Sequence, residues 1–436
     1  MKTNFVKLRW LFTMLLFVTT MIMPTMMLAK SIDLKIPEGD GAGTPYKIGT
    51  AEELYWFAGL VNGTLPGVKK DLSANAILTD DIIVNTGVLD PNKDLVSGND
   101  FIEWIPIGKS SSDDDAYTGT FDGNGHTISG LYFNKSNSWY VGLFGCIGAE
   151  GKISNVGVSD SYFQSSNCPY IGGVCGSNSG ELQNCSNSST VIGKENEYRI
   201  GGVCGYNSGT VKDCKNTGSV RGKETIGGVC GYNERRYNEK GGIIENSFNE
   251  GTVSGTGDYD VLNIGGVCGY NYGGTIKSCY NTASVSGQYS VGGVSGSLGS
   301  DVTNCYYLSG TVADGKSGIG GKDDENGKAV EMSKDRFKSG EVAWLLNGSK
   351  SVSTEESTLA WYQKLGENAD AYPVLKSTDH NTVYKAPLFS CDGTTRIGEY
   401  ANKPEGDKLS HNYQMAEKAD EGTSNLYSEE CAICHN

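Results

Sequence analysis

Short runs of apolar residues, bounded by Gly and Asn, recur through the middle of the chain. In 209–214 (GTVKDC) and 218–220 (GSV), for example, β-branched residues stand beside polar ones. None of these runs has the i, i+3, i+4 spacing of an amphipathic helix or its usual length of ~10 residues. The pattern therefore predicts short β-strands joined by turns.

These runs belong to an internal repeat. Each unit opens with a Gly-x-x-Gly string whose middle positions are apolar or small, and successive units begin 26 to 38 residues apart. The six strings lie at 142–145, 173–176, 202–205, 228–231, 266–269 and 293–296. A fixed period of short strands and Gly turns is typical of a β-solenoid. We expect an all-β fold, a right-handed parallel β-helix with short helical capping segments and a poorly structured C-terminal tail.

The same pattern divides the chain into five segments. Lys2, Lys7 and Arg9 precede an uncharged apolar run, which predicts a signal peptide, with an uncleaved anchor as the alternative. Thr50 and Glu53 form a capping-box signature ahead of an apolar-striped helix. The open strand edges of a solenoid need such covers at both ends. The predicted segments are a signal peptide (1–29), an N-terminal cap (30–116), a β-helix (117–318), a C-terminal cap (319–385) and a polar tail or truncated small module (386–436).

Two residue types recur in phase with the repeat. Asn returns at two positions of the unit, where stacked amides can hydrogen-bond from coil to coil and tolerate left-handed turns. These residues are Asn178, Asn207, Asn233 and Asn271, and Asn187, Asn216, Asn249 and Asn281. Nine of the 13 Cys lie at or beside two further in-phase positions. We interpret these nine as buried reduced thiols that act as small apolar residues, with cross-coil disulfides as the alternative.

Charge excludes several classes of partner. The chain has 51 acidic and 36 basic residues and a net charge of -15, which becomes -18 once the three positive charges of the signal segment are removed. A sequence-blind nucleic-acid binder needs a basic surface, and so does a protein that binds anionic lipid. No second apolar run approaches the ~20 residues of a membrane span. We expect a monomer that is secreted or on the cell surface, with no membrane insertion after signal removal.

Several segments resemble one known family. The unit at 200–220 (IGGVCGYNSGTVKDCKNTGSV) resembles the GLUG motif of exported bacterial repeat proteins. The segments 117–133 and 50–63 resemble the opening coil and the capping segment that often precede such repeats. The resemblance implies architecture and export rather than a reaction. Some GLUG proteins are immunoglobulin-cleaving metallopeptidases, but their His-Glu-x-x-His zinc signature does not occur in this sequence.

The candidate ligand-binding residues are aromatic and basic. Tyr206, Tyr232 and Tyr270 each precede a repeated Asn, so they form either a ladder of rings packed on one another or an outward stripe that stacks on sugar rings. Arg235 and Arg236 lie in an insertion at 234–240. The expected partner is a glycan or a host or cell-surface protein.

An enzyme is the alternative. A polysaccharide lyase or hydrolase on a β-helix needs basic groups for the sugar, and Arg199, Arg221, Arg235 and Arg236 lie in adjacent coils. The four differ in phase, however, and no nucleophilic triad or paired carboxylates stand out. The sequence therefore favours an adhesion or recognition module without catalytic activity.

No cofactor is expected in the repeats. The string 431–435 (CAICH) matches a haem-attachment motif, but no helical domain surrounds it. Zinc ligation by His411, Cys431 and Cys434 is the better alternative. A tail that binds no metal is the interpretation we favour.

Overall fold

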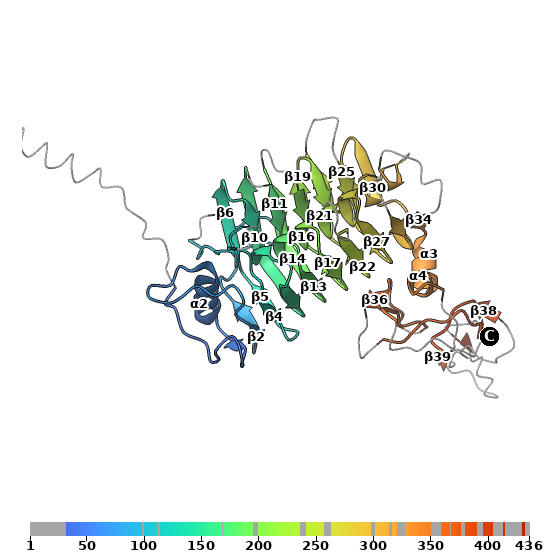
Figure 1. Ribbon diagram of the computed structural model, residues 1–436. Helices are drawn as coiled ribbons and strands as arrows, with labels where there is room; N and C mark the ends of the chain where they lie inside the picture. Colours follow the sequence, from blue (N-terminus) through green and yellow to red (C-terminus); the bar gives the residue numbers. More distant parts are fainter. Residues whose placement is uncertain are drawn as a thin grey trace, which may run out of the picture.

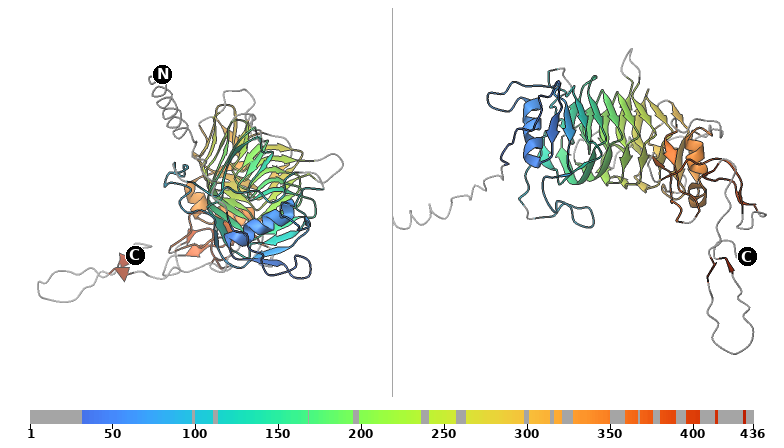
Figure 2. Two further views of the ribbon diagram at one scale, coloured as in Figure 1. Left: turned by 90° about the vertical axis from the view of Figure 1, so that its left-hand side faces the viewer. Right: turned by 90° about the horizontal axis from the view of Figure 1, so that it is seen from below.

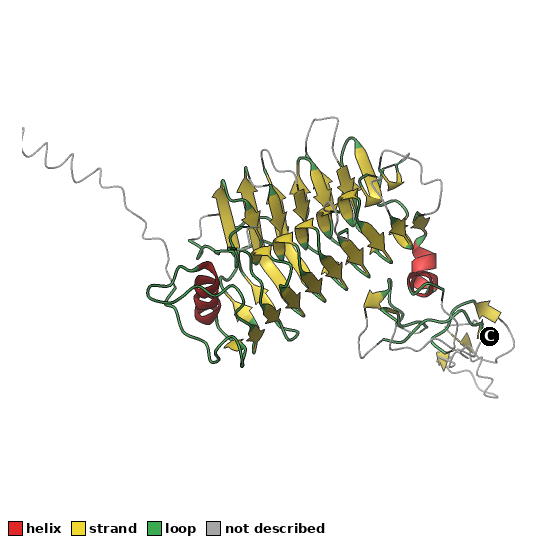
Figure 3. Cartoon of the chain, in the orientation of Figure 1, coloured by secondary structure: helices red, strands yellow, loops and turns green. Residues whose placement is uncertain are grey.

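The computed structural model describes residues 32–403, except 98–99, 111–113, 168, 195–198, 236–240, 257–262, 298–300, 314–315, 321–327, 350–358, 367, 376–379 and 390–395, together with 413–414 and 430–431. The chain is a β-solenoid, as the repeat predicted, and it has about eight turns where six repeat units were recognised in the sequence. Its coils lie side by side in one row, and three parallel sheets enclose the core (Figures 1 and 2). Strands fill the stack, and the helices of the described residues lie near its two ends (Figure 3).

Each sheet takes strands from successive coils. The nine-stranded sheet has, in spatial order, β1 (Tyr46–Ile48), β2 (Ala76–Leu78), β4 (Thr120–Asp122), β9 (Lys152–Ser154), β13 (Glu181–Gln183), β17 (Thr210–Lys212), β22 (Ile243–Glu245), β27 (Thr275–Lys277) and β31 (Val302–Thr303). Two of these strands, β1 and β2, precede residue 117, so the sheet extends into the N-terminal segment.

The 12-stranded sheet contains the Gly-x-x-Gly strings. It consists of β7 (Tyr140–Val141), β11 (Tyr170–Gly172), β15 (Arg199–Gly201), β20 (Thr225–Gly227), β25 (Asn263–Gly265), β30 (Ser290–Ser295), β26 (Cys268–Tyr272), β21 (Cys230–Glu234), β16 (Cys204–Asn207), β12 (Cys175–Asn178) and β8 (Phe144–Ile147), with β33 (Ser317–Ile319) on β30. Five coils therefore contribute two consecutive short strands each, and the coil that follows them contributes the single strand β30.

The 13-stranded sheet closes the third side. Its members are β29 (Val285–Ser286), β24 (Val253–Gly255), β19 (Val220–Gly222), β14 (Ser186–Gly193), β18 (Lys215–Asn216), β23 (Phe248–Asn249), β28 (Tyr280–Asn281), β32 (Cys305–Leu308) and β34 (Ala329–Met332), joined through β10 (Gly157–Ser166) to β3 (Ile82–Ile83), β5 (Thr127–Ser129) and β6 (Tyr132–Ser136). Three antiparallel pairs follow: β35 (Trp361–Tyr362) with β36 (Val374–Leu375), β37 (Leu388–Phe389) with β38 (Arg396–Gly398), and β39 (Tyr413–Gln414) with β40 (Glu430–Cys431).

Equivalent residues of successive coils stack on one another. Ile200 is paired in register with Ile226, and Cys204 with Cys230, and all four side chains are fully buried. The core is therefore a set of parallel columns of Ile, Val and Cys. In such a column, each apolar side chain is shielded from water by the equivalent side chains of the coils on either side. This burial stabilises the stack by about 25 cal/mol per Å² of apolar surface buried.

The two predicted Asn rows are buried amide ladders. Asn207 accepts a hydrogen bond from the Nδ2 of Asn178 (2.9 Å) and donates one to the Oδ1 of Asn233 (2.8 Å). The second row, from Asn187 to Asn281, has the same bonds at 2.7–2.8 Å. Because the ladder amides are essentially inaccessible to water, each coil must supply the partners of the next.

The second ladder explains the first Gly of the repeated string. A Cβ built on Gly202 would lie 2.3 Å from the Cγ of Asn216 and 2.2 Å from the carbonyl oxygen of Gly228. Both distances are far below contact distance, and the neighbours are a buried amide and backbone. Glycine is therefore needed here for close approach rather than for its backbone freedom.

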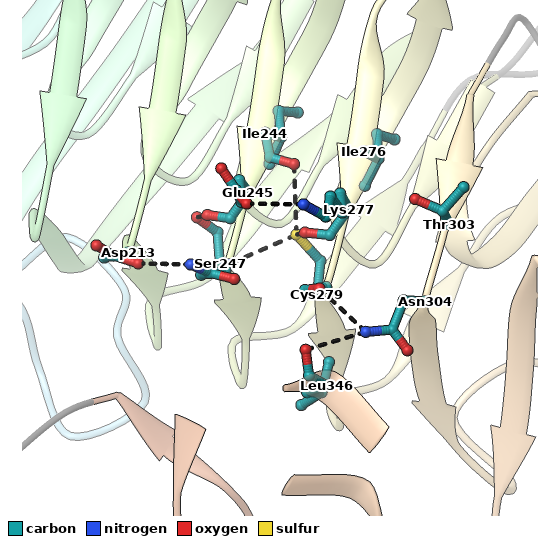
Figure 4. Close-up of polar contacts among 12 residues, drawn as sticks. Asp213, Ile244, Glu245, Ser247, Ile276, Lys277, Cys279, Thr303, Asn304 and Leu346 are labelled. Atoms are coloured by element: carbon teal, nitrogen blue, oxygen red, sulfur yellow. Dashed lines mark hydrogen bonds and ion pairs between the residues drawn. The ribbon is translucent and has the colours of Figure 1, made fainter. Parts of the chain in front are cut away.

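Residues with a left-handed backbone form a third row, separate from the two buried ladders. The sequence analysis was wrong to expect the ladder residues themselves at such turns. Six residues at the corner between the nine- and 13-stranded sheets have φ between +48° and +54°: Asn155, Asn184, Asp213, Asn246, Ser278 and Asn304. Asn246 donates to Asp213 (3.1 Å) and Asn304 to the hydroxyl of Ser278 (3.0 Å), along the corner seen in Figure 4. The residues of the two buried ladders sit on strands, where the backbone is extended.

The N-terminal helix closes the first coil. In α2 (Ala51–Asn62), the Thr50 hydroxyl accepts from the Glu53 N–H (3.3 Å), and the Glu53 carboxylate accepts from the Gly49 N–H (2.9 Å). The ring of Phe57 packs on Tyr117 and Phe121, with centroids 6.1 and 6.0 Å apart. The capping box thus starts a helix whose apolar face covers the end of the core.

The C-terminal segment packs along the side of the stack. The predicted amphipathic piece forms α3 (Lys334–Lys338) and α4 (Glu341–Leu346). These helices and Trp361 cover an outward aromatic row, Phe248, Tyr280 and Tyr306, on three consecutive coils. Asn304 also donates to the Leu346 carbonyl (3.0 Å), which ties α4 to the corner row (Figure 4). The expectation of a simple end cap did not include this lateral contact.

The amide ladder predicts a large stability effect at one residue. Replacing Asn207 by Ala removes the two ladder hydrogen bonds, to Asn178 and Asn233, together with those that its amide donates to the Gly209 and Ile243 carbonyls, and it leaves the Oδ1 of Asn233 without its donor. We expect a loss of about 2–4 kcal/mol in the free energy of unfolding, measured by urea denaturation. Asn92→Ala, at an exposed turn, is the matched control and should change stability by less than about 0.5 kcal/mol. Equal midpoints for the two variants would contradict the ladder.

The cysteines give a second prediction. All nine described Cys are buried free thiols, and burial raises the pKa of Cys204 and Cys268 well above the usual value. A thiol reagent reacts with the thiolate and needs access to it. We expect these nine thiols to be unreactive at pH 8 in the native protein and to react in denaturant without reductant. At least nine further thiols should therefore react on unfolding, and a smaller increase over the native protein would indicate cross-coil disulfides.

Candidate functional site

The three predicted tyrosines share one outward row of the 12-stranded sheet. Tyr206 pairs in register with Tyr232, and Tyr232 with Tyr270. The rings of Tyr206 and Tyr232 are stacked at 6.0 Å and 12°, and those of Tyr232 and Tyr270 lie 5.3 Å apart at 49°. Tyr206 is only 7% exposed, so the rings pack on one another as a ladder and present their edges and hydroxyl groups outward.

Neighbouring residues extend this row in both directions. Tyr272 stacks on Tyr270 (5.9 Å, 18°) and is 52% exposed. At the other end, Tyr170 contacts Tyr206 edge to face (5.5 Å) and stacks on Tyr140 (5.1 Å, 4°). The result is a continuous line of aromatic rings along successive coils.

Arg199 lies within this line. Its guanidinium carbon is 4.6 Å from the ring centroid of Tyr232, 5.1 Å from that of Tyr170 and 5.8 Å from that of Tyr206. Cation–π contacts of this kind hold the guanidinium in place without neutralising its charge. We call the set the tyrosine–arginine band: Tyr140, Tyr170, Arg199, Tyr206, Tyr232, Tyr270 and Tyr272.

One carboxylate lies close to the band. The hydroxyl of Tyr206 donates to the carboxylate of Glu234. Burial raises the pKa of Tyr232 to about 12, and the negative charge of Glu234 adds to the effect. The Tyr232 hydroxyl therefore keeps its proton at neutral pH and can donate a hydrogen bond to a ligand.

Arg199 lacks polar partners for part of its guanidinium. Its Nε is buried and has no hydrogen-bond partner, and no described carboxylate lies within 4 Å of the side chain. Arg235 is exposed, and its N–H donates to the Tyr272 carbonyl (2.9 Å), which places it at the exposed end of the band. Arg236, the other predicted arginine, lies outside the described residues. The sequence analysis named Arg199 only as a sugar-binding group of the alternative enzyme and did not place it among the tyrosines, since the repeat does not show that its column, with Tyr170 and Thr225, lies beside theirs.

The predicted zinc ligands are not brought together by described side chains. His411 and Cys434 lie outside the described residues, and Cys431 is described only as part of β40, which pairs with β39. Within the described ranges, no group of three or more His, Cys, Asp or Glu side chains could hold a metal ion. Zinc in the tail remains an untested prediction.

A groove that the sequence analysis did not predict lies beside the left-handed corner row. It has a volume of about 570 Å³ between the stack and the C-terminal segment, and Asp213, Lys215, Glu250 and His380 are among its lining residues. Burial raises the pKa of both the Asp213 and the Glu250 carboxyl groups. No repeat signal could reveal this groove, because one of its walls comes from residues beyond the solenoid.

None of the helices among the described residues is long and apolar enough to span a bilayer.

Comparisons with known proteins agree with the repeat. A family model described as "Glug: The GLUG motif" matches residues 196–221 and 260–286. Halomucin of Haloquadratum walsbyi is 38% identical over 84 residues, which is 19% of this chain and 1% of halomucin. A "Putative Gly-rich membrane protein" of Evansella cellulosilytica is 33% identical over 78 residues, 18% of this chain and 9% of that protein. The chain thus spans only a small part of either relative.

One solved structure has a similar fold. It is the crystal structure of a "putative immunoglobulin A1 protease" from Bacteroides ovatus, with a TM-score of 0.52 and 24% sequence identity. The match covers 79% of this chain and 95% of that one. The similarity shows a shared β-helical architecture.

The contacts of Arg199 predict its contribution to stability. Arg199→Gln removes the charge from three ring contacts, and we expect the free energy of unfolding to fall by about 1–2 kcal/mol. Arg235→Gln, at an exposed position, should change it by less than about 0.5 kcal/mol. Urea denaturation of both variants tests this difference. If both substitutions are neutral, the rings do not hold the guanidinium.

Proposed function

Because the chain is a GLUG-motif repeat protein folded as a β-solenoid, we propose that it is an exported, rigid recognition module that binds glycans. Export is supported by the signal-peptide pattern of residues 1–29. The ligand surface is the tyrosine–arginine band. The observation that carries the proposal is the unbroken line of rings from Tyr140 to Tyr272 on one outer face.

The band has the chemical groups that a sugar needs. Because the rings pack on one another, the band offers ring edges and tyrosine hydroxyl groups along its length, and Tyr272, which is 52% exposed, offers apolar area to the C–H groups of a pyranose. Ring centroids along the band lie 5.1–6.0 Å apart, so groups of one kind repeat at short intervals. A regular row of this kind suits an extended saccharide chain better than a compact small molecule.

The scaffold holds the band in place before any ligand arrives. Tyr232 is adjacent in sequence to Asn233, whose amide donates to Asn271 (2.8 Å) in the buried ladder. The backbone of Tyr206 is also fixed by parallel pairing with Ser177 and Tyr232, and that of Tyr232 by pairing with Tyr206 and Tyr270. A rigid surface loses little conformational entropy on binding, which favours affinity.

The enzyme considered in the sequence analysis stays the alternative. The solved structure with a similar fold is named as a protease, but the sequence described here lacks a His-Glu-x-x-His motif. The band itself contains tyrosine hydroxyls and a guanidinium, which supply hydrogen-bond donors for a bound saccharide.

A glycan array tests the proposal directly. The secreted protein should bind a subset of polysaccharides, and Tyr272→Ala or Tyr232→Ala should weaken that binding about 10-fold or more, since each substitution removes a ring contact worth ~1.5 kcal/mol. Tyr132→Ala is the matched control. Tyr132 also stacks on a tyrosine, Tyr162 (6.4 Å, 21°), but it lies on the 13-stranded sheet.

Three outcomes would count against the proposal. Equal losses for the Tyr272 and Tyr132 variants would place the ligand elsewhere. Release of new reducing ends from a bound polysaccharide would favour the enzyme. Binding to a host or cell-surface protein that is unaffected by removal of its glycans would replace the glycan with a protein partner.

A further inference from the structure

We infer that the ligand of the tyrosine–arginine band is an acidic carbohydrate, whose carboxylate or sulfate groups bind the guanidinium groups of Arg199 and Arg235. This inference rests on the proposed function and specifies its ligand class. It starts from a contrast among the arginines of the chain.

The described arginines fall into two groups. Arg221, Arg336 and Arg396 have carboxylate oxygens at 3.1, 2.6 and 3.7 Å. Arg199 and Arg235 have no described carboxylate within 4 Å, and both lie at the band. The two described arginines that lack a carboxylate partner thus both lie at the proposed binding surface.

The surroundings of Arg199 prepare it for an anion. Ring contacts with Tyr170, Tyr206 and Tyr232 fix the guanidinium and partly remove its water, while its Nε lacks an acceptor. A fixed planar guanidinium can bind a carboxylate or sulfate through two parallel hydrogen bonds. Such bonds strengthen where water is excluded, so a ligand anion gains more here than at a fully solvated arginine.

The neighbouring carboxyl groups leave this charge available. Glu234 accepts the hydrogen bond of the Tyr206 hydroxyl and forms no ion pair with Arg199. Glu224 lies next to β20, the strand that pairs with β15, and it forms no ion pair with Arg199. Neither side chain is therefore an internal counter-ion of Arg199.

The net charge adds selectivity. A polyanion is repelled by a protein with a net charge of -15, so non-specific adsorption over the whole surface is unfavourable. Binding of an acidic polysaccharide has to be local, at unpaired cationic side chains such as Arg199 in the band and Arg235 at its end.

The test compares one polysaccharide backbone with and without its charge. Polygalacturonate, its fully methyl-esterified form and a sulfated polysaccharide are titrated into the secreted protein at low salt. We expect at least one of the two acidic polymers to bind at least 10-fold more tightly than the ester, with affinity that falls as salt increases. Preference for the carboxylated or for the sulfated polymer identifies which anion the arginines take, and either preference supports the inference.

Substitutions locate the effect. Arg199→Gln and Arg235→Gln should each weaken binding of the acidic polymer about 10- to 100-fold and reduce its salt dependence. Arg221→Gln is the matched control, because Arg221 is paired with Asp94 and lies on the 13-stranded sheet, and it should leave affinity unchanged. If Arg199→Gln fails to fold, Arg235→Gln carries the test, since the Arg235 side chain is exposed.

The outcomes separate this inference from the proposed function. Equal affinity for the acid and the ester, or for the wild-type protein and the Arg235→Gln variant, would overturn the acidic ligand while glycan binding stands. Loss of binding for the Tyr272 variant alone would lead to the same conclusion. Absence of binding to every acidic and neutral polysaccharide would overturn both.

Discussion

The buried amide ladders are the constraint on which the rest of this structure depends. An amide carries one donor group and one acceptor, so Asn207 can bond the coil below and the coil above with the same side chain. In a dry interior these bonds exist only when adjacent coils are in register, because a shift of one residue would leave several amides without partners. The close contact between Gly202 and Asn216 adds a steric condition to the same register. Each coil therefore determines the position of the next.

The sequence revealed those features that repeat and little of what does not. The columns of Cys204 on Cys230, and the amide ladders, could be predicted, because residues that stack on their equivalents recur at the period of the chain. The left-handed corner row was assigned to the wrong Asn residues, because the period alone does not tell which Asn lies on a strand and which at a turn. Arg199 was not recognised as part of the band, since its contacts with Tyr206 and Tyr232 join two different strands of each coil. The groove at Asp213 depends on the non-repeating C-terminal segment and had no sequence signal.

The outer positions of the coils show how one scaffold serves two purposes. On the 13-stranded sheet, Ser186 and Lys215 are followed in register by Phe248, Tyr280 and Tyr306, and the aromatic part of this row is covered by α3, α4 and β35. On the 12-stranded sheet, an aromatic row contains an arginine without an anionic partner and no described helix covers it. Aromatic residues thus make an intramolecular contact on the 13-stranded sheet and form the proposed ligand surface on the 12-stranded sheet. Burial by the rest of the chain, rather than residue type, distinguishes the two.

The hydrogen bond that closes the turn around the 234–240 insertion shows where this protein can accept changes in length. The amide of Asn207 donates to the carbonyl of Gly209, two residues later, and Asn233 makes the equivalent bond to Gly242, nine residues later. The same amide-to-carbonyl hydrogen bond thus closes either a short turn or a longer loop. Segments of different length and composition can be exchanged at this point without a change of coil geometry. This corner, beside the exposed end of the band, is where new specificities can arise by insertion while the stack itself stays unaltered.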